Sequence, residues 1–293
     1  MKKIILLFSA AAMLAACNKE EVPSIPEKGG NEMHFVASYP GTKATSSAFE
    51  AGDVMGVYVT KYDGETPVPL QISGNYANNA ASTFDGAAWD TQPPVYWQEG
   101  RFDVYAYYPY MELSSVDECR FSVALDQSTE ETSGSLSGYE ASDFLWAKNE
   151  GIQQSETVPL VFKHRMSKLV VNLIKGEEFS GEIPPDAEVR VHNTVAEAYI
   201  DIATGIVTRN QYEQAKTITA RKVSDGVYTA IIVPQRIDTR RPLVEILSGD
   251  VSYLIESSFV FKSGVQHTIN ITLNNDPEKV GIEIGGDIEG GWE

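Results

Sequence analysis

From Met33 onward, apolar residues recur at every second position, and Gly, Pro, Asn and Asp interrupt this alternation about every ten residues. Such an alternation is typical of β-strands with one buried face. In Thr268–Leu273, for example, the residues Ile269, Ile271 and Leu273 alternate with polar side chains. No segment carries an apolar stripe at helical spacing for more than about two turns. The pattern therefore predicts an all-β protein.

The alternation predicts strands along most of the chain, at residues 34–39, 54–59, 102–108, 121–125, 168–174, 188–192, 227–233, 258–261 and 268–273. Short strands without long helices between them favour β-sandwiches over a βαβ fold. The polar run 149–157 separates two hydrophobic regions. We therefore predict two tandem sandwiches, at residues 31–157 and 158–278, and a tail at 279–293.

The first 30 residues have a different composition. Lys2 and Lys3 precede an apolar run that ends at Leu14, and small residues stand directly before Cys17. This arrangement is typical of a secretory signal, and the run is shorter than the roughly 20 residues that cross a bilayer. The hydrophilic residues 17–30 are expected to form a tether, because they cannot bury enough apolar surface to fold.

The sequence Leu14-Ala15-Ala16-Cys17 resembles a bacterial lipobox. The resemblance implies a signal peptide at residues 1–16, cleavage before Cys17, and attachment of a diacylglyceryl group to its sulfur. Each buried methylene contributes about 0.8 kcal/mol, so two or three acyl chains would anchor the protein to the outer membrane. Asn18–Glu21 resembles the acidic tag that directs Bacteroidales lipoproteins to the cell surface. An ordinary cleaved signal with a chance cysteine is the alternative.

Composition excludes several kinds of partner and site. The net charge is −18, and loss of the two signal-peptide lysines makes it −20, so nucleic acid is not expected as a partner. Cys17 and Cys119 are the only cysteines, which leaves no disulfide framework, and Cys119 is expected to be a small, half-buried residue. The four histidines are scattered singly, so we predict neither a metal site nor a cofactor.

Sequence patterns for catalysis are missing. The chain contains no nucleophile-elbow sequence, no phosphate-binding glycine loop and no EF-hand. Asp63-Gly64 and Asp85-Gly86 are better explained as hairpin turns. With 41 acidic residues, some carboxylates will lie close together by chance, so abundance does not indicate a glycosidase pair. We predict no catalytic residues and no enzymatic activity.

Five short sequences lie in order along the chain: Gly52–Tyr58, Tyr105–Tyr110, Ser142–Ala147, Phe162–Leu169 and Ile231–Gln235. Together they resemble the Bacteroidales fimbrillin family of type V pilus subunits, in particular its Mfa-like branch. The resemblance implies two transthyretin-like β-sandwich domains and a role in adhesion as a building block, tip or anchor of a surface fimbria. Its partners would be other fimbrial subunits and a host or bacterial surface.

Members of this family are described as losing their first strand when a trypsin-like protease cuts after a basic residue in the loop that follows it. The matching residue here is Lys43, before Ala44, where arginine is more usual. The surrounding Gly, Thr and Ser residues favour an exposed loop that a protease can cut. A solvated lysine in a plain turn is the alternative.

Loss of the first strand would expose unpaired backbone groups that a strand from the next subunit could fill. The displaced strand is expected to carry inward residues at alternate positions: Met33, Phe35, Ala37 and Tyr39. A candidate donor strand is the C-terminal tail, where Val280, Ile282 and Ile284 share one face. The last strand of the chain's own domain, or a flexible end, is an equally open interpretation of this tail.

The alternative function is that of a monomeric surface lipoprotein that binds glycans, since β-sandwiches host many functions and often display aromatic platforms. Trp89, Trp97 and Trp146 are the candidates, although such side chains are more often part of a core. A glycan binder should bind sugars as a monomer and be indifferent to cleavage at Lys43. A fimbrial subunit should not bind sugars in this way, and its behaviour should change on cleavage at Lys43.

Overall fold

The computed structural model describes residues 31–38, 49–132 and 135–289. Within these ranges the protein is all-β, and its only helices are two 3-10 turns, Glu140–Ser142 and Pro277–Lys279. The described residues form one compact unit. The nine strands that the alternation predicts all overlap observed strands, so the predicted fold class is confirmed.

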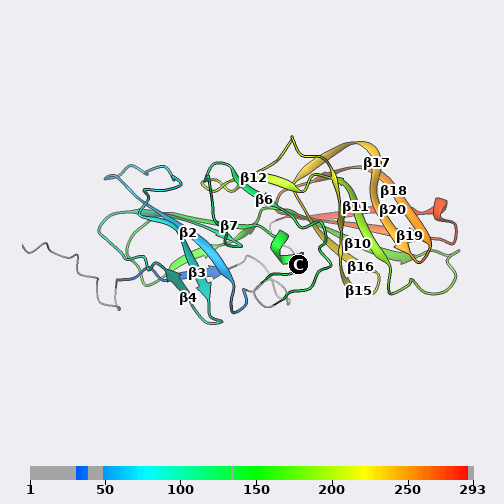
Figure 1. Ribbon diagram of the computed structural model, residues 1–293, viewed down its shortest axis with the longest axis horizontal. Helices are drawn as coiled ribbons and strands as arrows, with labels where there is room; N and C mark the ends of the chain where they lie inside the picture. The colour runs from blue at the N-terminus through cyan, green and yellow to red at the C-terminus, as the bar shows by residue number, and fades with distance from the viewer. Residues whose placement is uncertain (1–30, 39–48, 133–134, 290–293) are drawn as a thin grey trace, which may run out of the picture. The chain divides into compact units, whose positions relative to one another are not determined.

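The first large sheet has six antiparallel strands in the order β4-β3-β2-β5-β7-β9. Figure 1 labels β2, β3, β4 and β7 among them. These strands are β2 (Val54–Lys61), β3 (Ala77–Phe84), β4 (Trp89–Gln92), β5 (Phe102–Tyr108), β7 (Leu145–Ile152) and β9 (Lys163–His164). Every residue of the central strand β5 is buried, because side chains cover both faces of the sheet. A separate parallel pair consists of β1 (Phe35–Ser38) and β8 (Val158–Val161).

Two further sheets form the second half of the chain, with strand orders β15-β16-β10-β19-β20 and β14-β11-β17-β18. Their strands are β10 (Ser167–Lys175), β11 (Glu188–Thr194), β14 (Lys216–Thr219), β15 (Arg221–Ser224), β16 (Val227–Ile232), β17 (Gln235–Ser248), β18 (Val251–Phe261), β19 (Val265–Leu273) and β20 (Gly281–Glu289). In β19 the side chains of Ile269, Ile271 and Leu273 are completely buried, as the alternation predicts.

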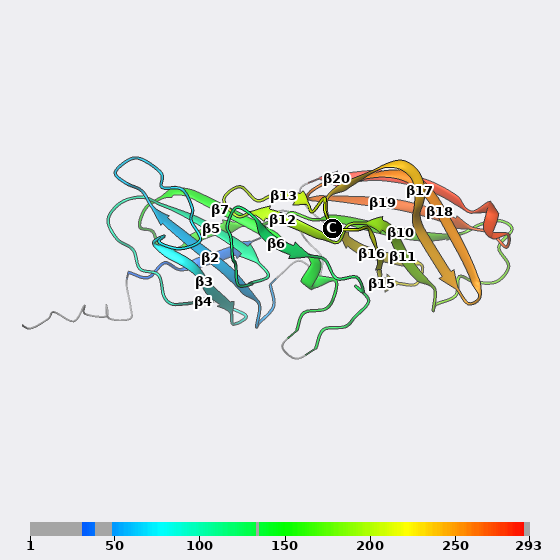
Figure 2. The ribbon, with the colours of Figure 1, turned by 45° about the horizontal axis from the view of Figure 1, so that its top comes forward.

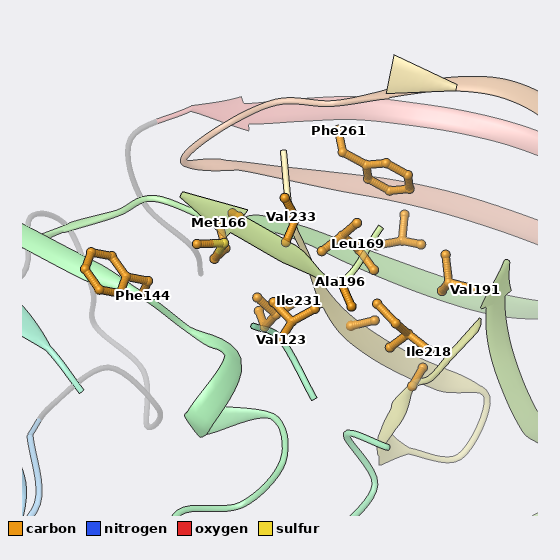
Figure 3. Close-up of a cluster of buried hydrophobic side chains, with 14 of the residues drawn as sticks. Val123, Phe144, Met166, Leu169, Val191, Ala196, Ile218, Ile231, Val233 and Phe261 are labelled. Atoms are coloured by element: carbon orange, nitrogen blue, oxygen red, sulfur yellow. The ribbon is translucent and has the colours of Figure 1, made fainter. Parts of the chain in front are cut away.

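Side chains from both of these sheets meet in one hydrophobic cluster. Figure 3 shows part of it, where Leu169 of β10 and Ile231 of β16 come from one sheet, and Val191 and Ile218 come from the other. Full burial of each such side chain contributes about 1.5–3 kcal/mol. The arrangement is that of a β-sandwich.

A third small sheet joins segments that are distant in the sequence. Its order is β13-β12-β6, with β6 (Cys119–Ser122), β12 (Glu197–Asp201) and β13 (Ile206–Arg209). Figures 1 and 2 show β6 beside β12, as their antiparallel pairing requires. Beyond β6, the side-chain amide of Gln127 bonds to both the amide and the carbonyl of Ile231, at 2.7 and 2.8 Å. The region 119–127 is therefore bound to strands from the second half of the chain.

The predicted division of the chain into two domains between residues 157 and 158 remains a prediction. One strand pairing crosses this predicted boundary. β8 directly follows the predicted boundary, yet it pairs with β1. Val158 and Leu160 lie in the same hydrophobic cluster as Met33 and Phe35. The first strand thus depends on a segment more than a hundred residues later in the sequence.

One of the five family-like sequences contains a glycine that the fold requires. A Cβ atom on Gly56 would meet the ring of Tyr107, which pairs with it across β2 and β5. The Tyr107 side chain is fully buried, and its hydroxyl bonds to Asn79 Oδ1 at 2.6 Å and the Met111 carbonyl at 2.7 Å. Burial raises the pKa of this phenol far above its ordinary value. Gly56 therefore marks a close approach of backbone and ring.

Candidate functional site

The first strand is part of the hydrophobic core. Met33 and Phe35 are only 1% and 3% exposed, and Ala37 of β1 is half-buried against the same core. Val36, which points the other way, is 48% exposed. The predicted inward positions at residues 33, 35 and 37 therefore face the core, and Tyr39 lies outside the described residues.

Backbone hydrogen bonds hold the start of the first strand on both sides. On one side, the amide of Met33 donates to the carbonyl of Val95 at 2.8 Å. On the other side, the amide of Val158 donates to the carbonyl of His34 at 2.7 Å, at the start of the parallel pairing with β8. The start of the strand therefore lies in a slot between residues 95–97 and β8, and β1 itself pairs with β8 in a two-stranded sheet.

The walls of this slot are apolar. Met33 and Phe35 belong to a cluster with side chains from the six-stranded sheet, from β8 and from the segments beside them, among them Met55, Val57, Val95, Phe102, Leu145, Leu160 and Phe162. All of these residues are buried. Together the two side chains of the first strand contribute about 3–6 kcal/mol by burial. We call this slot, with its walls and its flanking backbone groups, the first-strand groove.

Gly281–Glu289 of the C-terminal tail form the edge strand β20 of the five-stranded sheet, where they pair antiparallel with β19. Ile282 lies opposite Ile271, and Ile284 lies opposite Ile269. The two β19 residues are fully buried, whereas Ile282 and Ile284 are 38% and 55% exposed. Val280, which precedes the strand, is half-buried against the larger cluster. In this structure the tail is thus the last strand of its own sheet, with a poorly covered apolar face.

A polar cluster holds the far end of β20. Asp287 receives hydrogen bonds from His267 Nδ1 at 2.7 Å and from Lys262 Nζ at 2.6 Å. The backbone amide of Lys262 donates to His267 Nε2 at 3.1 Å, so Nδ1 carries the proton that His267 donates to Asp287. The Lys262 ammonium and the His267 ring hold the pKa of the Asp287 carboxyl below its usual value. Sequence reasoning missed this cluster, because its members are distant in the chain.

The three tryptophans considered for glycan binding are packed. Trp97 is 3% exposed and belongs to the same cluster as Met33. Trp89 contacts Phe49 edge to face, with ring centroids 4.8 Å apart. The Trp146 indole donates to the carbonyl of Ile202 at 2.7 Å, and a guanidinium covers its ring. These residues therefore do not supply an open aromatic platform.

The described part of the chain offers neither a reactive cysteine nor a metal site. Cys119 is only 1% exposed, deeper than the half-buried position that we expected, and burial raises the pKa of its thiol to about 12. In the described ranges, no three His, Cys, Asp or Glu side chains are grouped so that they could hold a metal ion. No helix of the described chain is long and apolar enough to span a membrane. The predicted lipidation and cleavage residues Cys17, Lys43 and Ala44 lie outside the described residues.

Comparison with known families gives two matches. A family model described as fimbrillin-like matches residues 42–290. A second model, for a prokaryotic membrane lipoprotein lipid attachment site, matches residues 1–18. No curated protein matches this chain.

Several solved structures share the fold. A proposed cell adhesion protein from Bacteroides uniformis has 19% identity and a TM-score of 0.66, with 89% of this chain and 98% of that chain covered. Another, from Bacteroides ovatus, has 16% identity and a TM-score of 0.68, with coverage of 91% and 100%. A fimbrial protein from Bacteroides ovatus has 16% identity and a TM-score of 0.51, with coverage of 83% and 48%. At these identities the similarity shows the fold alone.

Proposed function

Because this chain belongs to the fimbrillin-like family, we propose that it is a pilus subunit that assembles by exchange of its first strand. The lipid attachment site supports its transport to the outer membrane as a lipoprotein before assembly. The observation that carries the proposal is the first-strand groove, in which the side chains of Met33 and Phe35 are buried and the backbone at the start of the strand is paired on both sides.

Loss of the first strand would leave this groove in an unfavourable state. The amide of Val158 and the carbonyl of Val95 would lose their partners, and apolar side chains around them would meet water. Each unpaired buried polar group costs about 1–3 kcal/mol. A strand from another subunit would restore both the hydrogen bonds and the apolar contacts. The free energy of assembly would therefore come from the same interactions that hold the first strand before cleavage.

The tail has the pattern that a donor strand needs. Both segments carry apolar residues at alternate positions: Met33, Phe35 and Ala37 in the first strand, and Val280, Ile282 and Ile284 in the tail. Ile282 and Ile284 are 38% and 55% exposed in β20, so they would gain burial in a groove. Donation requires release of β20 from β19 and of Asp287 from its two partners. A subunit whose tail stays in its own sheet would act as a tip or an anchor.

Cleavage after Lys43 would also decide the fate of the lipid. Cys17 and the first strand both precede this residue, so a cut there releases the anchor together with the strand. The lipid would then serve transport and would keep the subunit unassembled until cleavage. Without a cut, the anchor is permanent and the protein is a base subunit.

Limited digestion tests this function directly. The mature chain, with Cys17→Ser to remove the lipid, is treated with trypsin, sequenced from its new N-terminus, and analysed on a denaturing gel without boiling. We expect a fragment that begins at Ala44 and a ladder of polymers. Lys43→Ala should prevent both, whereas the charge-matched control Lys43→Arg should retain both. A cut at another place together with a purely monomeric product would contradict strand exchange by this route.

A chain that ends at residue 279 separates the two halves of the mechanism. It should still be cut before Ala44, because the loop is unchanged, but it should form no ladder. A ladder from this truncated chain would show that the tail is not the donor strand.

A further inference from the structure

An open pocket of about 520 Å³ lies at the small sheet β13-β12-β6 and at the loop that follows β13. It is distant in the sequence from the first strand and from the tail. Small-molecule sites have volumes of about 300–1,000 Å³, so the pocket has room for a ligand as large as one or two sugar rings. Its lining combines aromatic rings with polar side chains of several kinds.

Tyr212 is the most unusual residue of this pocket, because its side chain is 86% exposed. It lies on the loop between β13 and β14. Single exposed apolar residues are common on proteins and need no function. The loop that carries Tyr212, however, is anchored in a way that fixes the position of this ring.

The anchor of the loop is Asn210, which is only 4% exposed. Its side-chain oxygen accepts a hydrogen bond from the backbone amide of Tyr212 at 3.0 Å, and its amide group donates to Glu197 Oε1 at 2.5 Å. Glu197 is held in turn by Arg120, whose Nη2 donates to Oε1 at 2.9 Å and to Oε2 at 2.8 Å. The Arg120 guanidinium lowers the pKa of Glu197, which therefore stays ionised at neutral pH. The loop is thus bonded to β12 and β6 through buried and charged groups.

A second ring lines the same pocket. Tyr199 of β12 is half-buried, and its hydroxyl lies 3.4 Å from the side-chain nitrogen of Asn210. Two tyrosines from different elements therefore border one space, one from a strand and one from the anchored loop. Tyrosine combines an apolar ring face with a polar tip, which suits ligands that have both kinds of surface.

The polar residues of the pocket indicate the charge of the ligand. Glu118 supplies a carboxylate, Arg209 supplies a guanidinium, and Gln211 supplies an amide that can both donate and accept. Within the described ranges, Arg209 makes no side-chain hydrogen bond or ion pair. One negative and one positive side chain leave the pocket without net charge, and the net charge of −18 on the whole chain disfavours an anion.

We infer that this pocket binds a neutral saccharide on the folded subunit. A sugar ring offers an apolar C–H face, which can lie against the ring of Tyr212. Its neighbouring hydroxyl groups can bond to the planar side chains of Glu118, Arg209 and Gln211. The site is complete within one chain and involves neither Lys43 nor the tail, so it goes beyond the proposed assembly mechanism and does not depend on it.

The test is binding of defined sugars to the mature chain with Cys17→Ser. Titration calorimetry and saturation-transfer NMR measure the binding. The probes are the methyl glycosides of glucose, galactose, mannose, fucose, N-acetylglucosamine and N-acetylgalactosamine and their common disaccharides. Glucuronate and N-acetylneuraminate serve as anionic comparators. We expect at least one neutral saccharide to bind, with saturation transfer to ring protons.

Variants of the loop link binding to the pocket. Tyr212→Ala should weaken binding at least about tenfold, whereas Tyr212→Phe should retain most of it, because the ring face makes the main contact. The matched control is Gln214→Ala, an exposed residue of the same loop that does not line the pocket. Thermal unfolding of all three variants should match that of the parent chain, because both positions are exposed.

Three results would overturn the inference: no binding by any neutral probe, binding of the anionic comparators alone, or binding that Tyr212→Ala leaves unchanged. The trypsin-induced ladder is measured on the same Tyr212→Ala protein and should be unaffected. Failure of sugar binding is therefore distinguishable from failure of strand exchange.

Discussion

Phe35 lies opposite Val158 in the parallel register of β1 and β8, and the two side chains are 3% and 0% exposed in the same hydrophobic cluster. A residue that precedes the expected cleavage loop thus depends on one that lies more than a hundred positions later. The contact is part of the folded precursor and would be lost on cleavage. It therefore offers a way to separate precursor stability from polymer stability.

Phe35→Ala should destabilise the uncleaved chain by about 3–5 kcal/mol, because it removes a buried ring and leaves a cavity. Urea unfolding of the parent and the variant measures this change. The matched control is Val36→Ala, which lies one position away on the exposed face and should change stability by no more than about 0.5 kcal/mol. After cleavage the two variants should give polymers of equal stability, since the cut removes both positions 35 and 36 from the subunit. Unequal polymers would show that the first strand stays in place.

Gly56→Ala should destabilise the six-stranded sheet, because its new Cβ would overlap with atoms of the Tyr107 ring. The ring cannot move freely, since its hydroxyl is bonded to Asn79 and Met111. We expect a loss of at least about 1–3 kcal/mol in urea unfolding. Gly286→Ala is the control, because no atom lies within 4 Å of its Cβ position. Equal stability of the two variants would contradict the close approach.

The attachment of β20 should weaken in acid. The pKa of Asp287 is lowered in the folded state, first by the hydrogen bond from Lys262 and then by that from His267. A lowered pKa means that the stabilisation is present above the unfolded value of about 3.9 and is lost as pH falls through the folded value. Hydrogen-exchange protection of β20, corrected for the intrinsic rate, should therefore decrease below about pH 4. Asp287→Asn should lower this protection at neutral pH and remove the decrease, and a pH dependence that survives the substitution would contradict this role.

Cys119 should resist alkylation in the folded protein. Its thiol is 1% exposed, and its pKa is raised to about 12 by burial. At pH 8 only roughly one thiol in ten thousand would be ionised, and the thiolate is the reactive form. In a Cys17→Ser chain, iodoacetamide should therefore modify Cys119 only at the rate of unfolding, and modification should become rapid in urea. Rapid modification without denaturant would show that the region around β6 opens locally.

Much of the fold follows from local patterns. The predicted strand at residues 102–108 has the same bounds as β5. Ile269 and Ile271, which the alternation places on the inward face, are buried. Alternation is informative because successive side chains in a strand point to opposite faces. β3 (Ala77–Phe84) carries no such signal, since its Asn, Ala and Ser residues lie on a partly exposed strand. The predicted strand at residues 121–125 ends early, because pairing with β12 stops at Ser122 and Leu125 is 44% exposed.

By itself, the sequence determined the all-β class, the lipid attachment site and the inward positions of Met33 and Phe35, since each depends on residues that are close together in the chain. It also determined the family, through short sequences that occur in order along the chain. Tertiary structure alone decided that β1 pairs with β8, that Asp287 meets Lys262 and His267, and that Tyr199 and Tyr212 border one pocket. These contacts join segments far apart in the sequence, and strand pairing depends on the register and burial of the whole sheet, which no local pattern encodes.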